Sequence, residues 1–117
     1  MQKNNCLLSI EEDSGVLIAI LGGEIDHHSA VWVRTEIDEA IARIRPQKTV
    51  LDLSAIDFMD SSGIGLVMGR YAKMRANGGE LSVRNPNGRI LKIFKMAGLE
   101  KIVSIENEEI NEKEEKK

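Results

Sequence analysis

The chain has 117 residues, of which 42% are hydrophobic but only 3% aromatic, so it is long enough for one domain with an aliphatic core. Its formal net charge of −3 argues against nucleic acid as a partner, because nucleic-acid-binding proteins usually carry a basic patch. The longest apolar run, residues 16–21, is too short to cross a membrane, and a single cysteine without a signal-peptide core predicts a cytoplasmic protein.

The first half of the chain predicts two strands followed by a helix. Residues 6–10 are expected to form an edge strand, and a hairpin turn joins it to the apolar strand at residues 16–21. Gly22-Gly23 is expected to end this second strand. A helix with one apolar face then begins near residues 26–29, and Pro46 stops it.

The second half of the chain predicts two strand–helix pairs and a short last strand. The elements are expected in this order: a buried strand at 49–53, a loop at 54–59, a helix at 61–76, a half-covered strand at 80–84, a helix at 89–97 and a strand at 102–105. The inward face of the longer helix is expected to consist of Ile64, Val67, Met68, Tyr71 and Met74. Residues 107–117 are almost wholly charged, so we expect a frayed helix or disorder there.

Strands and helices alternate along the chain, which predicts parallel strands joined by right-handed crossovers. We therefore expect an α/β fold with a mostly parallel sheet of four to five strands and about four helices. A single domain should span residues 1–106, followed by a charged tail at 107–117. In a parallel sheet the helices begin at the C-terminal ends of the strands, so Asp26 and Ser61 should lie at the same end of the domain.

Two serines occur at the start of the helix at 61–76, where backbone N–H groups lack intrahelical partners. A serine there either caps the helix or accepts a phosphate, whose negative charge a helix start favours. One of Ser61 and Ser62 is enough for a cap, and Asp60 can also serve, so one hydroxyl is surplus. The spacing alone favours a plain cap and leaves a phosphoacceptor open.

Two neighbouring features have simpler interpretations. Adjacent histidines on a helix point about 100° apart and chelate a metal poorly. We therefore interpret Asp26-His27-His28 as a helix start with Asp26 as the N-cap and two exposed histidines, not as a metal site. Gly65 and Gly69 are four residues apart, and we expect them to allow tight packing of their helix on the sheet.

The sequence argues against an enzyme. A nucleophile elbow around Ser61 needs a glycine where Met59 stands, and both histidines precede the serines. P-loop and dinucleotide-binding fingerprints and metal-ligand clusters are also missing from the sequence. We therefore expect a binding protein that uses no metal and no cofactor.

Two segments, residues 23–30 and 57–65, resemble the STAS-domain family of anti-sigma-factor antagonists. The second segment contains the family signature Asp60-Ser61-Ser62-Gly63. In the first, Asp26-His27-His28 favours the sporulation members of the family over the general-stress members. The resemblance covers about residues 5–105 and implies a STAS fold.

The resemblance also implies a mechanism of partner switching. The unphosphorylated protein would bind an anti-sigma factor that is also an ATP-dependent serine kinase, and so release a sigma factor without touching DNA. The kinase would phosphorylate Ser61, the phosphoprotein would dissociate, and a serine phosphatase would restore it. The partner-binding residues implied are Asp26, Asp60, Ser61, Ser62 and Gly63. Ser62 then becomes the expected helix cap.

Two other functions stay open within this family. One is a general-stress or sensory STAS protein with a different kinase partner, and the other is a STAS domain that binds a small ligand. Under the main hypothesis, a phosphate on Ser61 adds about −1.5 to −2 charges beside Asp60 and near Asp26. Because a helix start tolerates negative charge, we expect the switch to act at the interface and not by refolding.

Overall fold

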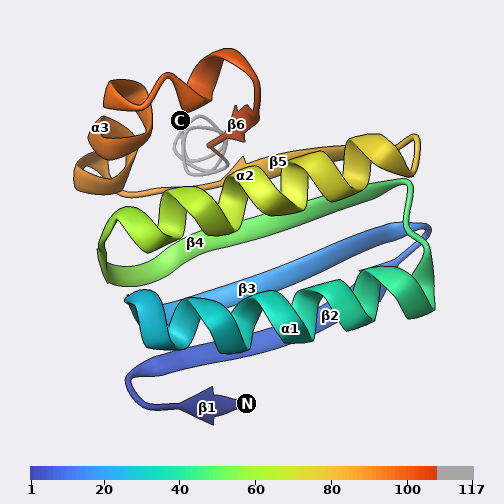
Figure 1. Cartoon of the computed structure of the whole chain (residues 1–117), viewed down its shortest axis with the longest axis horizontal. Coiled ribbons are helices and arrows are strands. Elements are labelled where there is room, and N and C mark those ends of the chain that lie inside the picture. Colours follow the sequence, from blue (N-terminus) through green and yellow to red (C-terminus); the bar gives the residue numbers. More distant parts are fainter. Residues whose placement is uncertain (108–117) are drawn as a thin grey trace, which may run out of the picture.

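The computed structural model describes residues 1–107 (Figure 1). Apart from Asn107, the charged tail expected at 107–117 lies outside the described residues. Six strands form one sheet in the order of the sequence: β1 (Gln2–Lys3), β2 (Cys6–Asp13), β3 (Val16–Ile25), β4 (Lys48–Met59), β5 (Glu80–Arg84) and β6 (Ser104–Glu106). The helices described are α1 (His27–Ile44), α2 (Ser61–Ala76), α3 (Gly88–Met96) and the short 3₁₀ helix η1 (Leu99–Lys101).

The sheet is mixed, which corrects the prediction of a mostly parallel sheet. β1, β2 and β3 are antiparallel neighbours, whereas β3, β4, β5 and β6 run parallel. The expected four to five strands and about four helices become six strands and three α-helices within residues 1–107. The unforeseen strand is β1, which consists of only two exposed polar residues and carries no apolar pattern. Because β1 pairs with β2, the strand at residue 6 is not the edge that was expected.

The predicted hairpin between β2 and β3 is confirmed. Ser14 and Gly15 form a two-residue turn with φ values of 53° and 84°. Positive φ at both central positions matches the right-handed twist of the two strands, and a glycine reaches it without strain.

The prediction that Gly22-Gly23 ends the second strand is wrong, because β3 continues to Ile25. The pairing of β3 with β4 shifts on either side of this pair, so the glycines form a bulge within the strand. Gly23 has a φ of 81°, and a side chain there would collide with the carbonyl of Asn5. That carbonyl accepts a hydrogen bond of 2.9 Å from the N–H of Glu24, so the glycine allows the N-terminal turn to approach closely.

The predicted loop at residues 54–59 is also wrong. β4 extends through this segment to Met59 and pairs with the second half of β3. Ile56 and Met59 are buried, whereas Ser54, Ala55, Asp57 and Phe58 are exposed, so the segment lacks the strict alternation that predicts a strand. Its length places the end of β4 beside the end of β3.

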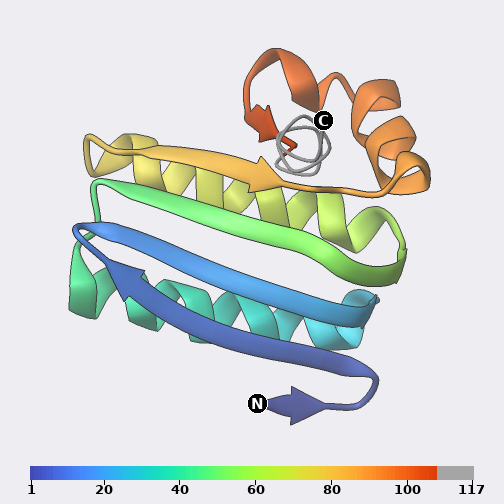
Figure 2. The same cartoon turned by 180° about the vertical axis from the view of Figure 1, so that it is seen from behind.

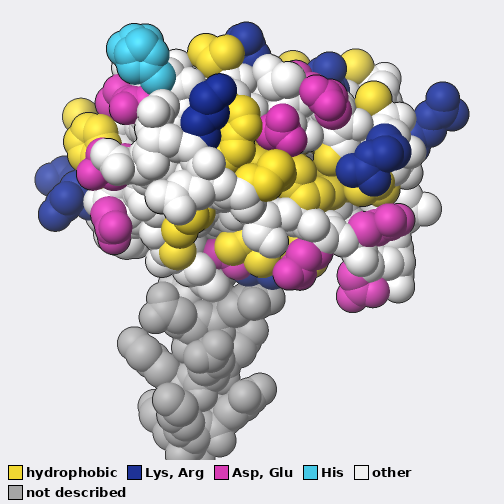
Figure 3. Space-filling model, turned by 90° about the horizontal axis from the view of Figure 1, so that it is seen from below, with side chains coloured by type: hydrophobic (Ala, Val, Ile, Leu, Met, Phe, Trp, Pro, Cys, Tyr) yellow, Lys and Arg dark blue, Asp and Glu magenta, His cyan; other side chains and the backbone are white. Residues whose placement is uncertain are grey.

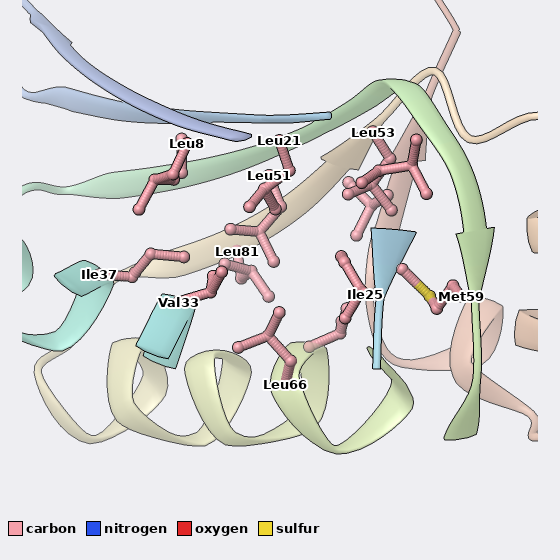
Figure 4. Close-up of a cluster of buried hydrophobic side chains, with 14 of the residues drawn as sticks. Leu8, Leu21, Ile25, Val33, Ile37, Leu51, Leu53, Met59, Leu66 and Leu81 are labelled. Carbon is pink, nitrogen blue, oxygen red and sulfur yellow. The ribbon is translucent and has the colours of Figure 1, made fainter. Parts of the chain in front are cut away.

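The helices α1 and α2 lie side by side on one face of the sheet (Figure 1), and from behind the sheet is seen without them in front (Figure 2). The core includes the layer between these two helices and the strands, and Ile90 and Phe94 of α3 belong to the same buried cluster. Figure 4 shows Val33 and Ile37 of α1 and Leu66 of α2 directed toward Leu21 and Leu51 of the sheet. Burial of this aliphatic layer is the main stabilising force. It also fixes where the two helices begin.

Candidate functional site

Two helices begin next to each other at one end of the sheet. Ile25 at the end of β3 is paired with Met59 at the end of β4, and each strand leads directly into a helix. The backbone N–H of Asp60 donates a hydrogen bond of 3.1 Å to the carbonyl of Ile25. The expectation that Asp26 and Ser61 share one end of the domain is therefore confirmed.

Asp60 is the N-cap of α2. Its backbone is extended, and its carboxylate accepts a hydrogen bond of 2.8 Å from the N–H of Ser62. Its carbonyl accepts the N–H of Gly63 at 3.0 Å. The expectation that Ser62 caps the helix is wrong, because a carboxylate one residue ahead of the helix already satisfies this role.

Ser61 is the first residue of α2 and is exposed. None of the side-chain hydrogen bonds formed among residues 1–107 uses its hydroxyl, because Asp60 supplies the cap. Ser62, one residue later, is half-buried. The arrangement thus presents one accessible hydroxyl at a helix start, where free N–H groups favour added negative charge.

Gly63 differs from the other candidate residues because it is buried. A side chain at this position would collide with the side chain of Met59, which is itself only 4% exposed. Glycine therefore allows the first turn of α2 to sit directly on the end of β4. Its place in the site is to position its neighbours.

Asp26 is the N-cap of α1, as expected. Its carboxylate accepts hydrogen bonds from the N–H of His28 at 3.0 Å and of Ser29 at 2.9 Å, and the Ser29 hydroxyl accepts the N–H of Asp26 at 2.9 Å. The bond from the Ser29 N–H is the main cause that lowers the pKa of Asp26, aided by the Ser29 hydroxyl and His28. The site therefore holds a carboxylate that stays ionised at neutral pH.

The two histidines protrude from the protein surface at one corner of the face seen in Figure 3. Their rings are stacked at a tilt, with centroids 4.0 Å apart. No group of three or more metal-ligating side chains occurs within the described part of the chain. This geometry gives no support to a metal site at His27 and His28.

A groove of about 280 Å³ runs between α1 and α2 beside these helix starts. Its lining includes His27, Val31, Arg34, Ser62, Gly65 and Arg70. The expectation that Gly65 and Gly69 pack against the sheet is wrong, because a side chain added at either would meet nothing within 4 Å.

Sequence analysis did not identify the two arginines of this groove, Arg34 and Arg70, as candidate functional residues. Arg70 is only 5% exposed, and its guanidinium lies 2.8 Å from the carboxylate of Asp38 on α1. The available signal was its spacing, since Arg70 follows the buried Leu66 by four residues and so lies on the same side of α2. An arginine at a core-facing position indicates either a buried ion pair or a functional site.

No helix among residues 1–107 is long and apolar enough to cross a membrane.

Three kinds of comparison identify the family. The model of the STAS domain matches residues 8–114. The anti-sigma F factor antagonist of Paenibacillus polymyxa is 42% identical over 107 residues, which are 92% of each chain. Among solved structures, the anti-sigma factor antagonist SpoIIAA in its unphosphorylated form has a TM-score of 0.77 and 30% identity, covering 90% of this chain and 92% of that one.

A second structure of SpoIIAA, described as a Bacillus cell fate determinant in the phosphorylated form, has a TM-score of 0.70 and 29% identity. It covers 92% of this chain and 98% of that one. These similarities extend over nearly the whole described fold, including both helix starts. The chain therefore belongs to the STAS-domain family of anti-sigma-factor antagonists.

Proposed function

We propose that this protein is an anti-sigma factor antagonist that phosphorylation of Ser61 switches off. Unphosphorylated, it binds an anti-sigma factor that is also a serine kinase, and a sigma factor is released. The name of the Paenibacillus polymyxa relative supports an anti-sigma F factor as the partner. A serine phosphatase removes the phosphate and returns the protein to its binding state, and we place this cycle in the cytoplasm.

The observation that carries this proposal is the capping of α2 by Asp60. Because the carboxylate accepts the N–H of Ser62 at 2.8 Å, the helix does not need the Ser61 hydroxyl. Ser61 is exposed and open to a kinase, whereas Ser62 lies half-buried on the side of the groove. The relative SpoIIAA, with structures in both an unphosphorylated and a phosphorylated form, supports two such states.

The chemistry of the switch follows from this position. The kinase transfers the γ-phosphoryl group of ATP to Ser61 Oγ, the hydroxyl proton passes to a base on the kinase, and ADP leaves. The new phosphate carries about −1.5 to −2 charges at a helix start, which its own domain tolerates. The carboxylates of Asp26 and Asp60 lie at the same end of the sheet, so a concentrated negative surface forms.

We propose the surface formed by Asp26, Asp60, Ser61 and Ser62, supported from below by Gly63, as the partner-binding site. A partner that accommodates a neutral hydroxyl meets repulsion and a desolvation cost when it faces the phosphate. The phosphoprotein then dissociates. Neither a metal nor a cofactor bound to this chain has a part in the cycle, and the chain acts on transcription without contacting DNA.

The experiment incubates the protein with the anti-sigma F factor of the same organism and Mg-ATP, followed by intact mass spectrometry. We expect the parent to gain one phosphoryl group and Ser61→Ala to gain none while still binding the kinase. Ser62→Ala is the matched control and should be phosphorylated like the parent. The assignment of Ser61 would be contradicted if Ser61→Ala gained a phosphoryl group. It would also be contradicted if Ser62→Ala gained none while Ser61→Ala was phosphorylated.

A further inference from the structure

We propose that the groove between α1 and α2 is the part of the interface that receives an acidic side chain of the anti-sigma factor. The inference rests on the proposed function and names the chemistry that the partner presents. Arg34 and Arg70 bind the carboxylate, and Gly65 leaves space for it. The groove thus forms the attractive half of an interface whose repulsive half is the phosphate on Ser61.

Arg34 lines the groove and carries a charge that no ion pair within the described residues balances. Arg70 is paired with Asp38 at 2.8 Å, and Lys73 lies 3.8 Å from the same carboxylate. None of the ion pairs formed among residues 1–107 includes Arg34, which is exposed. Asp38 therefore pairs with two cations and leaves Arg34 without an ion pair among these residues, so an anion from a partner can pair with Arg34.

The two arginines are close enough to repel each other. Burial is the largest cause that lowers the pKa of Arg70; Asp38 opposes it, and the neighbouring charge of Arg34 lowers it further. Asp38 offsets part of this repulsion, and a further anion beside Arg34 would reduce the rest. A carboxylate suits this task because the guanidinium fork binds it with two parallel hydrogen bonds.

Gly65 supports this assignment because a glycine at this position lowers the stability of α2 without a packing reason. A glycine inside a helix destabilises it by comparison with alanine. No packing contact requires a glycine here, since a side chain at Gly65 would meet no atom within 4 Å. Gly65 lines the groove next to Ser62, so its missing side chain keeps open the space in which a partner group lies.

A single acidic side chain fits this groove better than the other anionic ligands. Its volume of about 280 Å³ lies just below the range for small-molecule pockets, roughly 300 to 1,000 Å³. A nucleic acid would bring a row of phosphates against Asp26 and Asp60, which cap the two helices that form the groove. A protein surface can place one carboxylate between the arginines and keep its remaining charges away.

The groove and the switch lie within the same surface, and this explains the direction of the switch. Ser62 lines the groove, and Ser61 is its neighbour on the exposed turn. A phosphate on Ser61 repels the incoming carboxylate and also competes with it for the positive charges. The neutral hydroxyl does neither, so the unphosphorylated form binds.

The first test compares two charge reversals on α1, Arg34→Glu and Arg43→Glu. Arg43 is exposed and lies roughly 14 Å further along the helix, outside the groove. Titration calorimetry with the anti-sigma F factor of the same organism should show binding weakened about tenfold or more for Arg34→Glu. Arg43→Glu should bind within about twofold of the parent. Thermal melts of both variants confirm that they are folded.

The second test asks whether the open space at Gly65 is needed for binding, and it changes no charge. It compares Gly65→Ala with Gly69→Ala. Both glycines lie in α2 with open space around them, so both variants should melt at or above the temperature of the parent. Only Gly65 lines the groove, so only Gly65→Ala should bind the anti-sigma factor more weakly, by several fold.

The outcomes distinguish this inference from the proposed function. If the parent does not bind the anti-sigma factor, the proposed function fails and the inference fails with it. If the parent binds but Arg34→Glu equals Arg43→Glu and Gly65→Ala equals Gly69→Ala, the groove is not part of the interface, while the proposed function stands.

Discussion

Asp60 performs two structural tasks that together set the position of Ser61. Its carboxylate caps α2, and its backbone N–H is bonded to the carbonyl of Ile25 at 3.1 Å. The helix start is thereby tied to the end of the neighbouring strand. A rigid helix start keeps the exposed serine in one place, as the proposed kinase and binding partner would require.

Asp26 holds its helix in the same way but with a reciprocal partner, Ser29. The hydrogen bonds that lower its pKa also orient the carboxylate toward its own helix. Both carboxylates therefore contribute negative charge at fixed places. Under the proposed function, one further phosphate on Ser61 would therefore strengthen a negative charge that is already present at this end of the domain.

At Gly63 we predict a loss of stability from a single added methyl group. Gly63→Ala would press on the buried side chain of Met59, and the overpacking should exceed the gain in helix propensity. We expect the free energy of unfolding to fall by about 1 to 2 kcal/mol, measured by urea denaturation.

Gly69→Ala is the matched control for this change, because it lies in the same helix with open space around it. It should raise the free energy of unfolding by up to about 1 kcal/mol. Equal stability of Gly63→Ala and Gly69→Ala would show that Met59 moves aside without cost, and that the close contact does not matter.

Among the elements, β6 is held by a small charged cluster. The Nζ atom of Lys48 lies 2.7 Å from the carboxylate of Glu106, and the guanidinium of Arg84 lies 3.8 Å from it. The carbonyl of Glu106 also accepts the N–H of Asn85 at 2.7 Å. These contacts join the last described strand to the start of β4 and the end of β5.

We predict that the contribution of Glu106 to stability depends on pH. Burial raises the pKa of Glu106, but the hydrogen bond and charge of Lys48 outweigh it, so the pKa is lowered in the folded protein. A lowered pKa gives stability that is fully present above the ordinary value of about 4.3 and is lost as the pH falls through the folded value. At pH 7, Glu106→Gln should lose about 1 kcal/mol.

This difference from the parent should shrink as the pH falls below about 4, as followed by thermal melts across a pH series. Glu100→Gln serves as the control, because Glu100 is exposed and belongs to none of the ion pairs of residues 1–107. A stability difference for Glu106→Gln that stays the same from neutral to acidic pH would contradict the ionic explanation.

The positions of the helices were readable from the sequence because their ends carry strong local signals. The start of α2 at Ser61 and its end before Asn77-Gly78 follow from caps and breakers. The lengths of β3 and β4 could not be predicted from such local signals. Gly22-Gly23 has the local signature of a break, and only the approach of Asn5 in the folded chain turns it into a bulge.

The buried face of α2 was only partly predicted. Val67 and Met74 are buried as expected, but Met68 is 41% exposed, and Gly63, Leu66 and Arg70 complete the inner face. Hydrophobicity alone predicts that Met68, and not an arginine, occupies the buried face of α2. The carboxylate of Asp38, which makes burial of Arg70 possible, comes from another helix and is not visible in local periodicity.

At the scale of the whole molecule, the core and the proposed interface are separate. An apolar layer lies between the sheet and the helices α1 and α2 (Figure 4). Ser61 is the exposed first residue of α2, at the end of the sheet where both helices begin. A charge added at the exposed Ser61 is directed to solvent, whereas the buried Gly63 and Met59 lie beneath this turn. The fold should therefore remain unchanged while the surface changes its preference for partners.

The most direct measurement is titration calorimetry of the anti-sigma F factor with stoichiometrically phosphorylated protein and with the unphosphorylated parent, together with thermal melts of both. We predict that phosphorylation weakens binding by at least about tenfold and changes the free energy of unfolding by less than about 1 kcal/mol. Binding of the phosphoprotein as tight as that of the parent would contradict the electrostatic switch at Ser61. So would a loss of binding accompanied by a collapse of stability, because the switch would then act by unfolding.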